Sequence, residues 1–320
     1  MSDDDARPIR SISGGSVQEA ELGAARRVGW TAKRDRADSP FAQGVRRLRR
    51  STTALVGAFI VALLLVVALF ADVLAPKSPI ASDQGHTFER PSWSYPLGTD
   101  QLGRDMLSRV IHGSRISLAV GVSSVLLALF VGVPFGMIAG YYGGRADTLI
   151  MRTMDLILAF PIYLLAIILM VIFAPTAGLI GTMKVTGAIA IVRIPIYARL
   201  VRGSVLSIKE KEYIEACRAV GVRDPWILVR HVLPNCLAPI IVTTTLGIAT
   251  SIIVEATLSF LGLGTQPPTP SWGWDLKANV AFIQSNPWIS LFPGLAIFVT
   301  VLGFNLFGDG LRDALDPRLK

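Results

Sequence analysis

Long apolar runs alternate with polar segments along most of the chain. Each run has roughly 20 residues, the length that a helix needs to cross about 30 Å of hydrocarbon. The runs lie at residues 53–75, 116–140, 153–174, 181–201, 237–262 and 288–308. They predict an all-α integral membrane protein with about six transmembrane helices, and six crossings place both termini on the same side. The fourth run is the least regular, because Lys184 and Arg193 interrupt it.

The distribution of Lys and Arg predicts which side that is. Outside the runs, 22 Lys and Arg residues fall on the side of the termini and 6 fall on the opposite side. Because cytoplasmic loops keep more positive charge, both termini are predicted to be cytoplasmic, with loops 76–115 and 263–287 outside. The formal net charge of +8 follows from this topology. It predicts contact with the lipid bilayer and no nucleic-acid partner, and the basic cluster expected at the headgroups is Arg46, Arg47, Arg49 and Arg50.

The first 40 residues show no apolar periodicity, so they cannot bury enough surface to offset the entropy of ordering. We expect residues 1–45 to be a flexible, basic cytoplasmic tail and residues 46–320 to form the transmembrane domain. The first apolar run starts only after residue 50 and is long enough to span. It therefore predicts a retained helix and not a cleaved signal.

The polar loop at 202–236, between the fourth and fifth runs, contains the sequence EKEYIEACRAVGVRDPWILVRHVLPNC. Good helix formers at 210–220 predict a short helix, which Gly221 ends by adopting left-handed cap geometry. We expect Asp224 to cap a second helix with Pro225 at its first position. Pro234 is expected to close the segment. The pattern predicts a helix–turn–helix at the membrane face that docks a partner and does no chemistry.

Two outer segments also carry a pattern. Apolar positions at helical spacing over 105–118 predict an amphipathic helix along the outer surface, with the Asp and Arg pairs of the 76–115 loop fixing its fold. After the fifth run, prolines and tryptophans predict a stiff outer loop with Trp272 and Trp274 at headgroup level. That loop is either a surface for an external binding protein or an interfacial anchor.

Small and ionisable residues interrupt the spans. Glycine recurs every fourth residue at Gly132, Gly136 and Gly140, which favours close helix packing over contact with a substrate. Asp155 and Arg193 lie near the cytoplasmic ends of the third and fourth runs, where they either pair or each reach the interface. An ionisable group inside a span costs roughly 2.5 to 3.5 kcal/mol, so it should face the bundle interior.

Glu255 lies deepest of the acidic residues. It is the best candidate for a polar residue that lines a pathway. The alternative, a hydrogen-bonded carboxylate that braces the outer loop, has at least equal weight.

The sequence offers no candidate for catalysis. Cys217 and Cys236 both fall in the cytoplasmic loop, where thiols stay reduced. His86, His112 and His231 are scattered over both sides of the membrane. We therefore expect free thiols, no metal site and no catalytic residue. The chain lacks the G-x-x-x-x-G-K-[ST] phosphate loop, so ATP would have to be bound by another subunit.

Five segments in order carry a family resemblance: LGTDQLGRDMLSRVIHGSRISL at 97–118, AFP at 159–161, the 210–236 loop, EATLSFLGLGTQPPTPSWG at 255–273, and FPGLAIFVTVLGFNLFGDGLRDALDPRLK at 292–320. Over roughly residues 45–320 the chain resembles the C-type permease of dipeptide and oligopeptide ABC importers. The resemblance implies the type I importer architecture, in the plasma or inner membrane of a bacterium or archaeon. The loop at 202–236 then corresponds to the EAA loop that fits into a groove on a cytoplasmic ATPase.

The resemblance also implies partners and a function. The expected partners are a second related permease, two cytoplasmic ATP-binding subunits and an extracytoplasmic solute-binding protein, and the expected function is to form half of a peptide pathway. Alternatives are another cargo (glutathione, nickel or an oligosaccharide) or an ion-coupled secondary transporter, which would need a second deep carboxylate. The residues expected to couple to the ATPase are Glu212, Tyr213, Glu215, Ala216, Arg218, Ala219, Gly221, Asp224 and Pro234.

Overall fold

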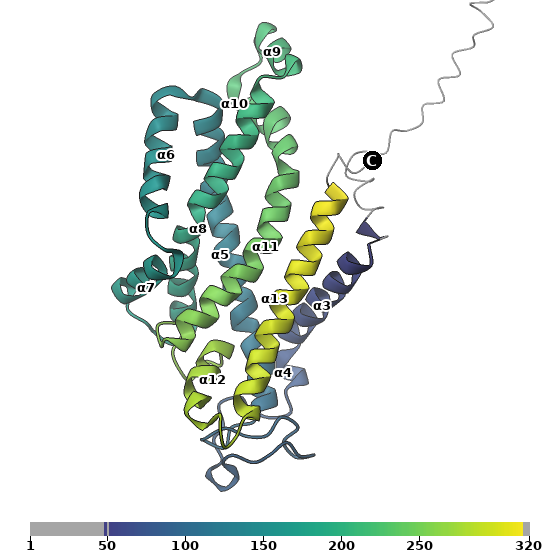
Figure 1. The fold of residues 1–320 in the computed structure, drawn as a ribbon, viewed down its shortest axis with the longest axis vertical. Helices are drawn as coiled ribbons and strands as arrows, with labels where there is room; N and C mark the ends of the chain where they lie inside the picture. The colour runs from purple at the N-terminus through teal and green to yellow at the C-terminus, as the bar shows by residue number, and fades with distance from the viewer. Residues whose placement is uncertain (1–47, 50, 316–320) are drawn as a thin grey trace, which may run out of the picture. The chain divides into compact units, whose positions relative to one another are not determined.

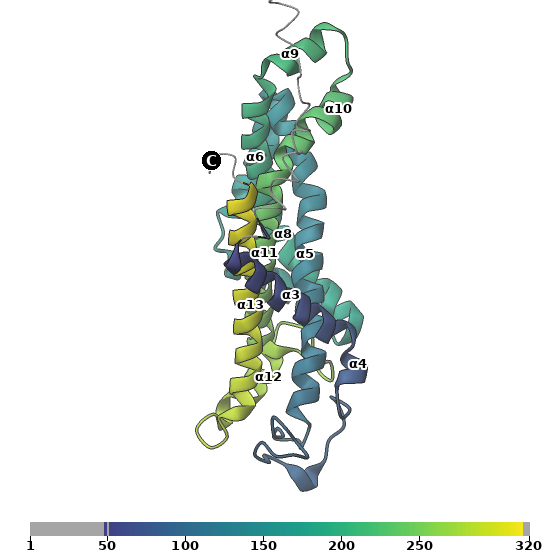
Figure 2. The same ribbon diagram turned by 90° about the vertical axis from the view of Figure 1, so that its right-hand side faces the viewer.

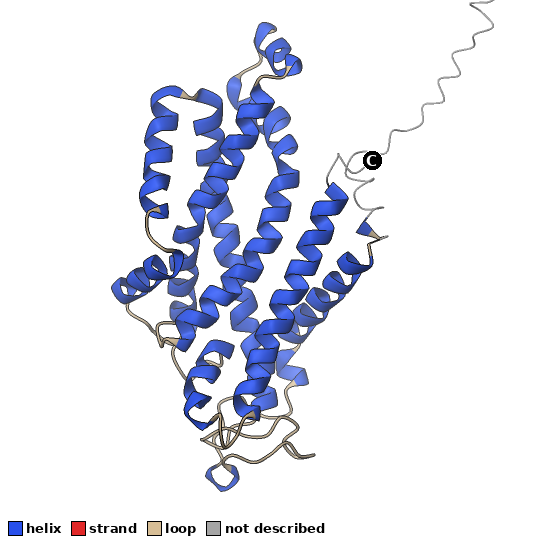
Figure 3. Cartoon of the chain, viewed as in Figure 1, coloured by secondary structure: helices blue, strands red, loops and turns tan. Residues whose placement is uncertain are grey.

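The structure is a computed structural model that describes residues 48–49 and 51–315. Helices make up all the regular secondary structure of these residues, as Figure 3 shows. The tail expected at 1–45 and the basic cluster, apart from Arg49, lie outside the described residues. The helices are α3 (Thr52–Leu69), α4 (Ala71–Leu74), η1 (Gln84–His86), α5 (Met106–Tyr142), α6 (Gly144–Leu158), α7 (Ile162–Phe173), α8 (Gly178–Lys209), α9 (Glu212–Ala219), α10 (Asp224–Ile227), η2 (Leu228–Val232), α11 (Leu233–Phe260), α12 (Trp272–Asn279), η3 (Val280–Phe282) and α13 (Trp288–Leu315).

The described part of the chain is a bundle of long helices (Figure 1). Five helical segments in it are long and apolar enough to cross a membrane, and a sixth crossing results if the bent pair α6 and α7 counts as one span. The beginning of α3 and the end of α13 point toward the end of the bundle that carries α9. Figure 2 shows α9 and α10 projecting at that end, with α12 and the segment before α5 at the opposite end.

The third apolar run does not form the single straight span that the sequence predicted. The chain bends by 89° between α6 and α7. The bend falls at Ala159-Phe160-Pro161, where proline disfavours the helical conformation of the residue before it and cannot donate a backbone hydrogen bond. The predicted span at 153–174 therefore begins in one helix and ends in another.

The separate amphipathic helix predicted at 105–118 is also wrong. These residues form the first turns of α5, which continues without a break through the second apolar run to Tyr142. Asp105 is the N-cap residue of this helix and accepts a hydrogen bond from the backbone N–H of Ser108. The amphipathic spacing was real, but it belongs to one end of a long helix that packs on its neighbours there and does not lie flat on the surface.

The α5–α8 interface confirms the predicted role of the glycine series. A Cβ atom added at Gly136 would lie 2.4 Å from the carbonyl oxygen of Ala198, and one at Gly132 would lie 2.7 Å from that of Ile194. At Gly140 the nearest atom is Cβ of Val205, at 2.8 Å. The backbones of the two helices therefore touch along one face, which only glycine permits.

Candidate functional site

The predicted docking loop stands at one end of the bundle, between the end of α8 and the start of α11 (Figure 1). It contains α9, a turn, and α10. One side chain fixes α9 to the bundle, because Ile214 is fully buried while its neighbours Tyr213 and Glu215 are exposed. Ile214 belongs to a cluster of buried apolar residues, which we call the anchoring cluster; its other members are Met137, Tyr141, Val201, Val205, Ile208, Ile227, Leu228, Val232, Cys236 and Ile240.

The turn after α9 confirms the predicted glycine cap. Gly221 has a φ of +79°, in the left-handed region. The backbone N–H of Val222 donates to the carbonyl of Cys217 at 3.0 Å, and that of Gly221 donates to the carbonyl of Arg218 at 2.9 Å. This pair of hydrogen bonds is the Schellman motif, in which a left-handed residue closes the carbonyl end of a helix. The glycine thus sets the direction in which the chain leaves α9.

Asp224 does not cap the second helix as predicted. Arg223 is the N-cap residue of α10, and no side chain donates or accepts a hydrogen bond at that cap. The Asp224 carboxylate instead accepts a hydrogen bond of 2.7 Å from the hydroxyl of Tyr141, at the end of α5. Pro225 falls at the second helical residue, one place later than predicted. The carboxylate therefore connects the loop to α5 and leaves its own helix end uncapped.

Pro234 does not close the loop. Helical backbone continues from Asp224 to Phe260 as a single segment of 37 residues. Its second part is the π-helical turn η2, in which the i to i+5 bonding accommodates an extra residue, and Pro234 falls in the first turn of the following α11. A proline inside a continuous helix removes one backbone hydrogen bond, and here the helix continues past it without a break. The loop is thus joined to the fifth span by a helix.

Most residues predicted to couple to an ATPase share one property, a solvent-exposed position at this end of the bundle. The exposed ones are Glu212, Tyr213, Glu215, Ala216, Arg218, Ala219, Gly221 and Pro234, whereas Asp224 is half-buried. Apolar side chains accompany them, since Val220 is 79% exposed and Trp226 is 57% exposed. Carboxylates, a guanidinium and large apolar groups therefore gather on a surface that the described chain leaves uncovered.

Sequence patterns missed the residues that hold this surface in place. Tyr141 bridges the loop, because its hydroxyl accepts from Nε of Arg218 at 3.3 Å while donating to Asp224. The Arg218 guanidinium also lies 4.8 Å from the centre of the Tyr141 ring. Lys209 donates from Nζ to the carbonyl of Gly140 at 3.0 Å. One of these contacts could have been predicted from the sequence: Ile214 is a lone branched apolar residue in a polar helix, which indicates the side of α9 that packs on the bundle.

Glu255 is completely buried near the opposite end of α11. Its carboxylate accepts hydrogen bonds from the hydroxyls of Ser117 at 2.9 Å, Ser259 at 2.8 Å and Ser271 at 3.0 Å. These serines come from α5, from α11 and from the N-cap position of α12. The carboxylate therefore points into the bundle and joins three elements, which is the geometry of the bracing alternative.

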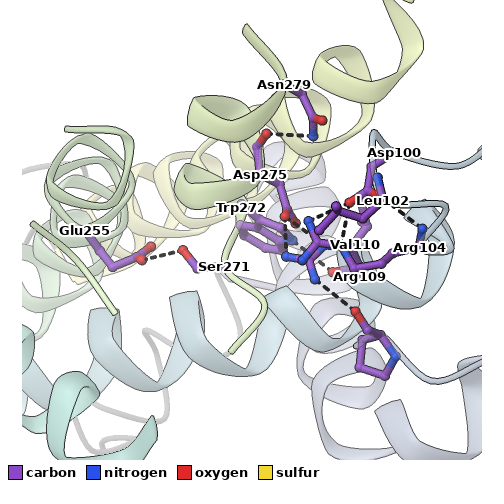
Figure 4. Close-up of polar contacts among 11 residues, drawn as sticks. Asp100, Leu102, Arg104, Arg109, Val110, Glu255, Ser271, Trp272, Asp275 and Asn279 are labelled. Carbon is purple, nitrogen blue, oxygen red and sulfur yellow. Dashed lines mark hydrogen bonds and ion pairs between the residues drawn. The ribbon is translucent and has the colours of Figure 1, made fainter. Parts of the chain in front are cut away.

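A second polar group lies beside it, and Figure 4 draws both. Arg109 of α5 donates from Nε and Nη2 to Oδ1 of Asp275 in α12, at 2.8 and 2.5 Å. Its remaining nitrogen donates to the carbonyl of Pro79 at 2.9 Å. Both side chains are almost fully buried. The ion pair fastens α12 and the segment before α5 to α5. The pair expected within the 76–115 loop is formed by Arg104 and Asp100, which lie 2.6 Å apart.

Trp272 does not sit at headgroup level as predicted. It is 1% exposed, and its indole N–H donates to the carbonyl of Val110 at 2.9 Å. The ring lies against Gly113 of α5, where an added Cβ would be 2.7 Å from it. Trp274 is half-buried, and Nζ of Lys277 lies 4.7 Å from the centre of its ring. The outer loop is thus a folded cover over the end of α5.

Asp155 and Arg193 do not pair with each other. Asp155 pairs with Arg199 at 2.5 Å, and both side chains are about half exposed. Arg193 donates from Nη2 to the hydroxyl of Thr250 in α11. The difference arises because α6 runs alongside the part of α8 that holds Arg199, whereas Arg193 faces α11.

A separate charged contact joins α4 to α5, outside the spans. The hydrogen bond that Arg115 donates to the Asp72 carboxylate lowers the pKa of Asp72.

The chain was compared with known proteins. Residues 132–320 match the family described as "Binding-protein-dependent transport system inner membrane component", and residues 39–91 match the N-terminal transmembrane domain of oligopeptide transport permease C. The chain belongs to the binding-protein-dependent permease family. This permease is therefore a multi-pass bacterial inner-membrane subunit of an ABC importer, it is not an enzyme, and it works with ATPase and substrate-binding partners. Its family carries the EAA motif.

Curated relatives match the permease over nearly their whole length. The dipeptide transport system permease protein DppC of Alkalihalophilus pseudofirmus is 45% identical over 88% of this chain and 91% of its own. The glutathione transport system permease protein GsiD of Pectobacterium atrosepticum is 46% identical over 88% and 92%. The di/tripeptide permease DppC of Pseudomonas aeruginosa is 44% identical over 88% and 93%.

A solved structure supports the fold. The permease is similar to a chain described as the MetNI methionine ABC transporter in inward-facing conformations, with a TM-score of 0.54 and 18% identity. The similarity covers 66% of this permease and 98% of that chain. The two chains therefore share the importer permease architecture. About a third of this permease has no counterpart in the solved chain, whereas nearly all of the solved chain is matched.

Proposed function

We propose that this permease forms half of the transmembrane pathway of a peptide importer and that its loop at 202–236 docks a cytoplasmic ATPase. The cargo class rests on the relatives, which are named for dipeptides, di- and tripeptides and glutathione. Glutathione is itself a tripeptide, so these names share one chemistry: a short chain of amide bonds that carries a carboxylate. Nickel and oligosaccharides stay alternatives that no feature of the site favours.

The geometry of the loop is the observation that carries the docking proposal. A helix projects from the bundle, its buried Ile214 and the Tyr141–Asp224 hydrogen bond fix it on one side, and its other side is exposed. An exposed surface with large apolar residues, surrounded by charges, is typical of protein interfaces. Because α8 and α11 leave the loop directly, a displacement of the loop moves the ends of two spans.

The composition of the complete importer follows from this proposal. A second related permease would supply the other half of the pathway, and two ATP-binding subunits would each receive one docking loop. ATP is bound there, so this chain needs no cofactor of its own. A solute-binding protein would deliver peptide at the opposite face. In this proposal the loop and both termini lie in the cytoplasm, and residues 46–320 form the transmembrane domain.

Ion-coupled secondary transport is the competing mechanism. It would need a carboxylate free to exchange an ion with water. Glu255 is the deep carboxylate of the described spans, and three serine hydroxyls enclose it. This arrangement supports a structural brace more than an exchanging site, and the pathway role of Glu255 stays a prediction.

Uptake into proteoliposomes tests the proposal. The reconstituted importer should accumulate a labelled di- or tripeptide when ATP and the loaded solute-binding protein are both present, and an uncoupler of ion gradients should leave the rate unchanged. Uptake that follows an ion gradient without ATP would contradict the ABC mechanism. Uptake of nickel or an oligosaccharide in place of peptide would contradict the cargo and leave the mechanism standing.

A further inference from the structure

One cation lies at the middle of helix α8, and not near the cytoplasmic end where the sequence placed it; among the described residues it has no countercharge. Arg193 is the sixteenth residue of α8, which has 32 residues, and its side chain is 9% exposed. Among the described residues it forms no ion pair, and its one hydrogen bond is the bond to Thr250. A guanidinium has five N–H donors, so most of them are left for another group. Ionisable residues at this depth generally mark the path of a substrate or ion.

A second polar group lies beside Arg193. The hydroxyl of Tyr197, one turn along α8, is buried and makes no regular hydrogen bond among the described residues, although the Thr244 side chain is within its reach. Both groups point at the same place on α11, because a Cβ added at Gly247 would lie 2.5 Å from the Tyr197 hydroxyl and 3.7 Å from Nη1 of Arg193. Buried polar groups are normally satisfied, so the unused donors of Arg193 at this place indicate that an acceptor from outside the described chain binds there.

The exposed face of α11 at this position differs from the apolar faces of the bundle. Threonines recur at Thr243, Thr250 and Thr257, a spacing of seven that keeps them on one side of the helix, and Thr250 is exposed. The exposed face of α13 instead carries Leu291, Leu295, Phe298 and Leu302. A row of hydroxyl groups is typical of a helix face that contacts water in a pathway, whereas a purely apolar row is typical of a face that contacts lipid.

A groove leads from this face toward the end of the bundle that carries the docking loop. It has a volume of about 480 Å³ and lies between α8, α11 and α13; its lining includes Leu200, Thr243, Leu246 and Arg312. Leu246 is one turn from Thr250, whose hydroxyl donates to the Leu246 carbonyl at 3.1 Å. Arg312 is exposed at the far end. Arg312 is therefore the cation at the mouth of the groove. Arg193 is a second cation, bonded to Thr250 one helical turn beyond Leu246 at the inner end.

We propose that Arg193 binds the carboxylate of the transported peptide, with Tyr197 and Thr250 completing the site. The inference rests on the proposed function, because it takes the cargo to be a peptide. A planar guanidinium offers two parallel donors to a carboxylate, a geometry that lysine cannot reproduce. Arg193 belongs to α8 and Thr250 to α11, the two helices that flank the docking loop. A bound carboxylate would therefore contact the same two helices that an ATPase would move.

A charge-sensitive labelling experiment tests the site without assuming the cargo. In the assembled importer with Cys217→Ser and Cys236→Ala, the variant Leu246→Cys is treated with anionic and cationic methanethiosulfonate reagents of matched size. We expect the anionic reagent to react faster, and Arg193→Gln should lower this preference by about tenfold. Arg193→Lys should keep most of it. The control is Lys184→Gln, which removes a half-buried cation near the other end of the same helix and should not change the reagent preference.

Peptide protection then tests the ligand. Trialanine should slow labelling of Leu246→Cys, trialanine amide should protect about ten- to a hundred-fold less, and Arg193→Gln should remove the difference, because a hydrogen bond to a charged group is lost. Equal protection by both peptides in the parent protein would overturn the proposal. It would also be overturned if Leu246→Cys reacted with the reagents no faster than a cysteine that water cannot reach. Loss of the second permease from Arg193→Gln complexes would show that the arginine pairs with that subunit instead.

The two failures can be told apart. If the parent complex carries out no ATP-driven uptake of trialanine, the proposed cargo is wrong, and the reagent preference still decides whether Arg193 attracts an anion. If the parent complex transports trialanine and Arg193→Gln transports it with unchanged KM, the cargo stands and the proposed site is wrong.

Discussion

The sharpest prediction concerns Gly221, which closes α9 at a φ of +79°. Replacing it with valine forces a β-branched residue into left-handed backbone, at a cost of about 1–2 kcal/mol or more. Nothing lies within 4 Å of a Cβ added at this position, so a clash with neighbours adds nothing and the cost is conformational. That amount shifts an equilibrium by a factor of about 5–30. We expect the two hydrogen bonds of the cap to break, and α9 to tilt away from its docked position as a result.

The assay is ATP-driven uptake measured beside retention of the ATPase, in membranes that hold equal amounts of each variant. Gly221→Val should lose both. Gly221→Asn is the matched control, because asparagine adds a larger side chain yet tolerates left-handed backbone, and it should stay close to the parent. Full uptake with valine would show that the cap does not position the docking surface. Equal losses with asparagine and valine would show that bulk and not backbone conformation is responsible.

Four other variants test separate features. Glu215→Lys reverses an exposed charge of α9 and should weaken ATPase retention with normal membrane insertion; a parallel fall in insertion would indicate misfolding instead. Arg109→Met should lower the thermal unfolding temperature, because it leaves Asp275 buried without a countercharge at a cost of about 3–5 kcal/mol, and adding Asp275→Leu should recover most of the loss. Gly136→Val should separate α5 from α8 and reduce the amount of folded protein, whereas an unchanged yield would refute their close contact. Ser207→Cys should resist an impermeant thiol reagent in intact cells and react after permeabilisation, and labelling without permeabilisation would reverse the topology.

Local rules predicted the features that depend on local backbone. Apolar length gave the spans, because every buried backbone group in a bilayer needs a partner and only a helix of about 20 residues supplies that within one segment. Gly221 was predictable because a glycine after good helix formers is the usual left-handed cap. The glycine series of α5 was predictable from its spacing alone. Its partner helix α8 was not.

Tertiary contacts account for the errors. Asp224 is chemically suited to cap a helix, but Tyr141, far away in the sequence, takes its carboxylate. Trp272 has the composition of an interfacial anchor, yet the space over Gly113 accommodates its ring. The 89° bend between α6 and α7 was signalled by Pro161, but proline is also tolerated inside spanning helices of this chain, as Pro134 shows. For Asp224 and Trp272 the deciding contact joins residues that no local pattern relates.

These contacts also determine how movement of the docking loop can reach the pathway. The loop is not a loose connector, because Tyr141 and Lys209 tie it to the end of α5, and α5 touches α8 backbone to backbone along the glycine face. α5 and α8 should therefore move with the loop as one body. The helix that follows the loop contains the π turn η2, where the regular bonding pattern changes. Such turns are frequent at functional sites. We therefore expect α11 to change its angle to the α5–α8 pair at η2. Arg193 of α8 and Thr250 of α11 lie on opposite sides of the interface whose geometry this change would alter.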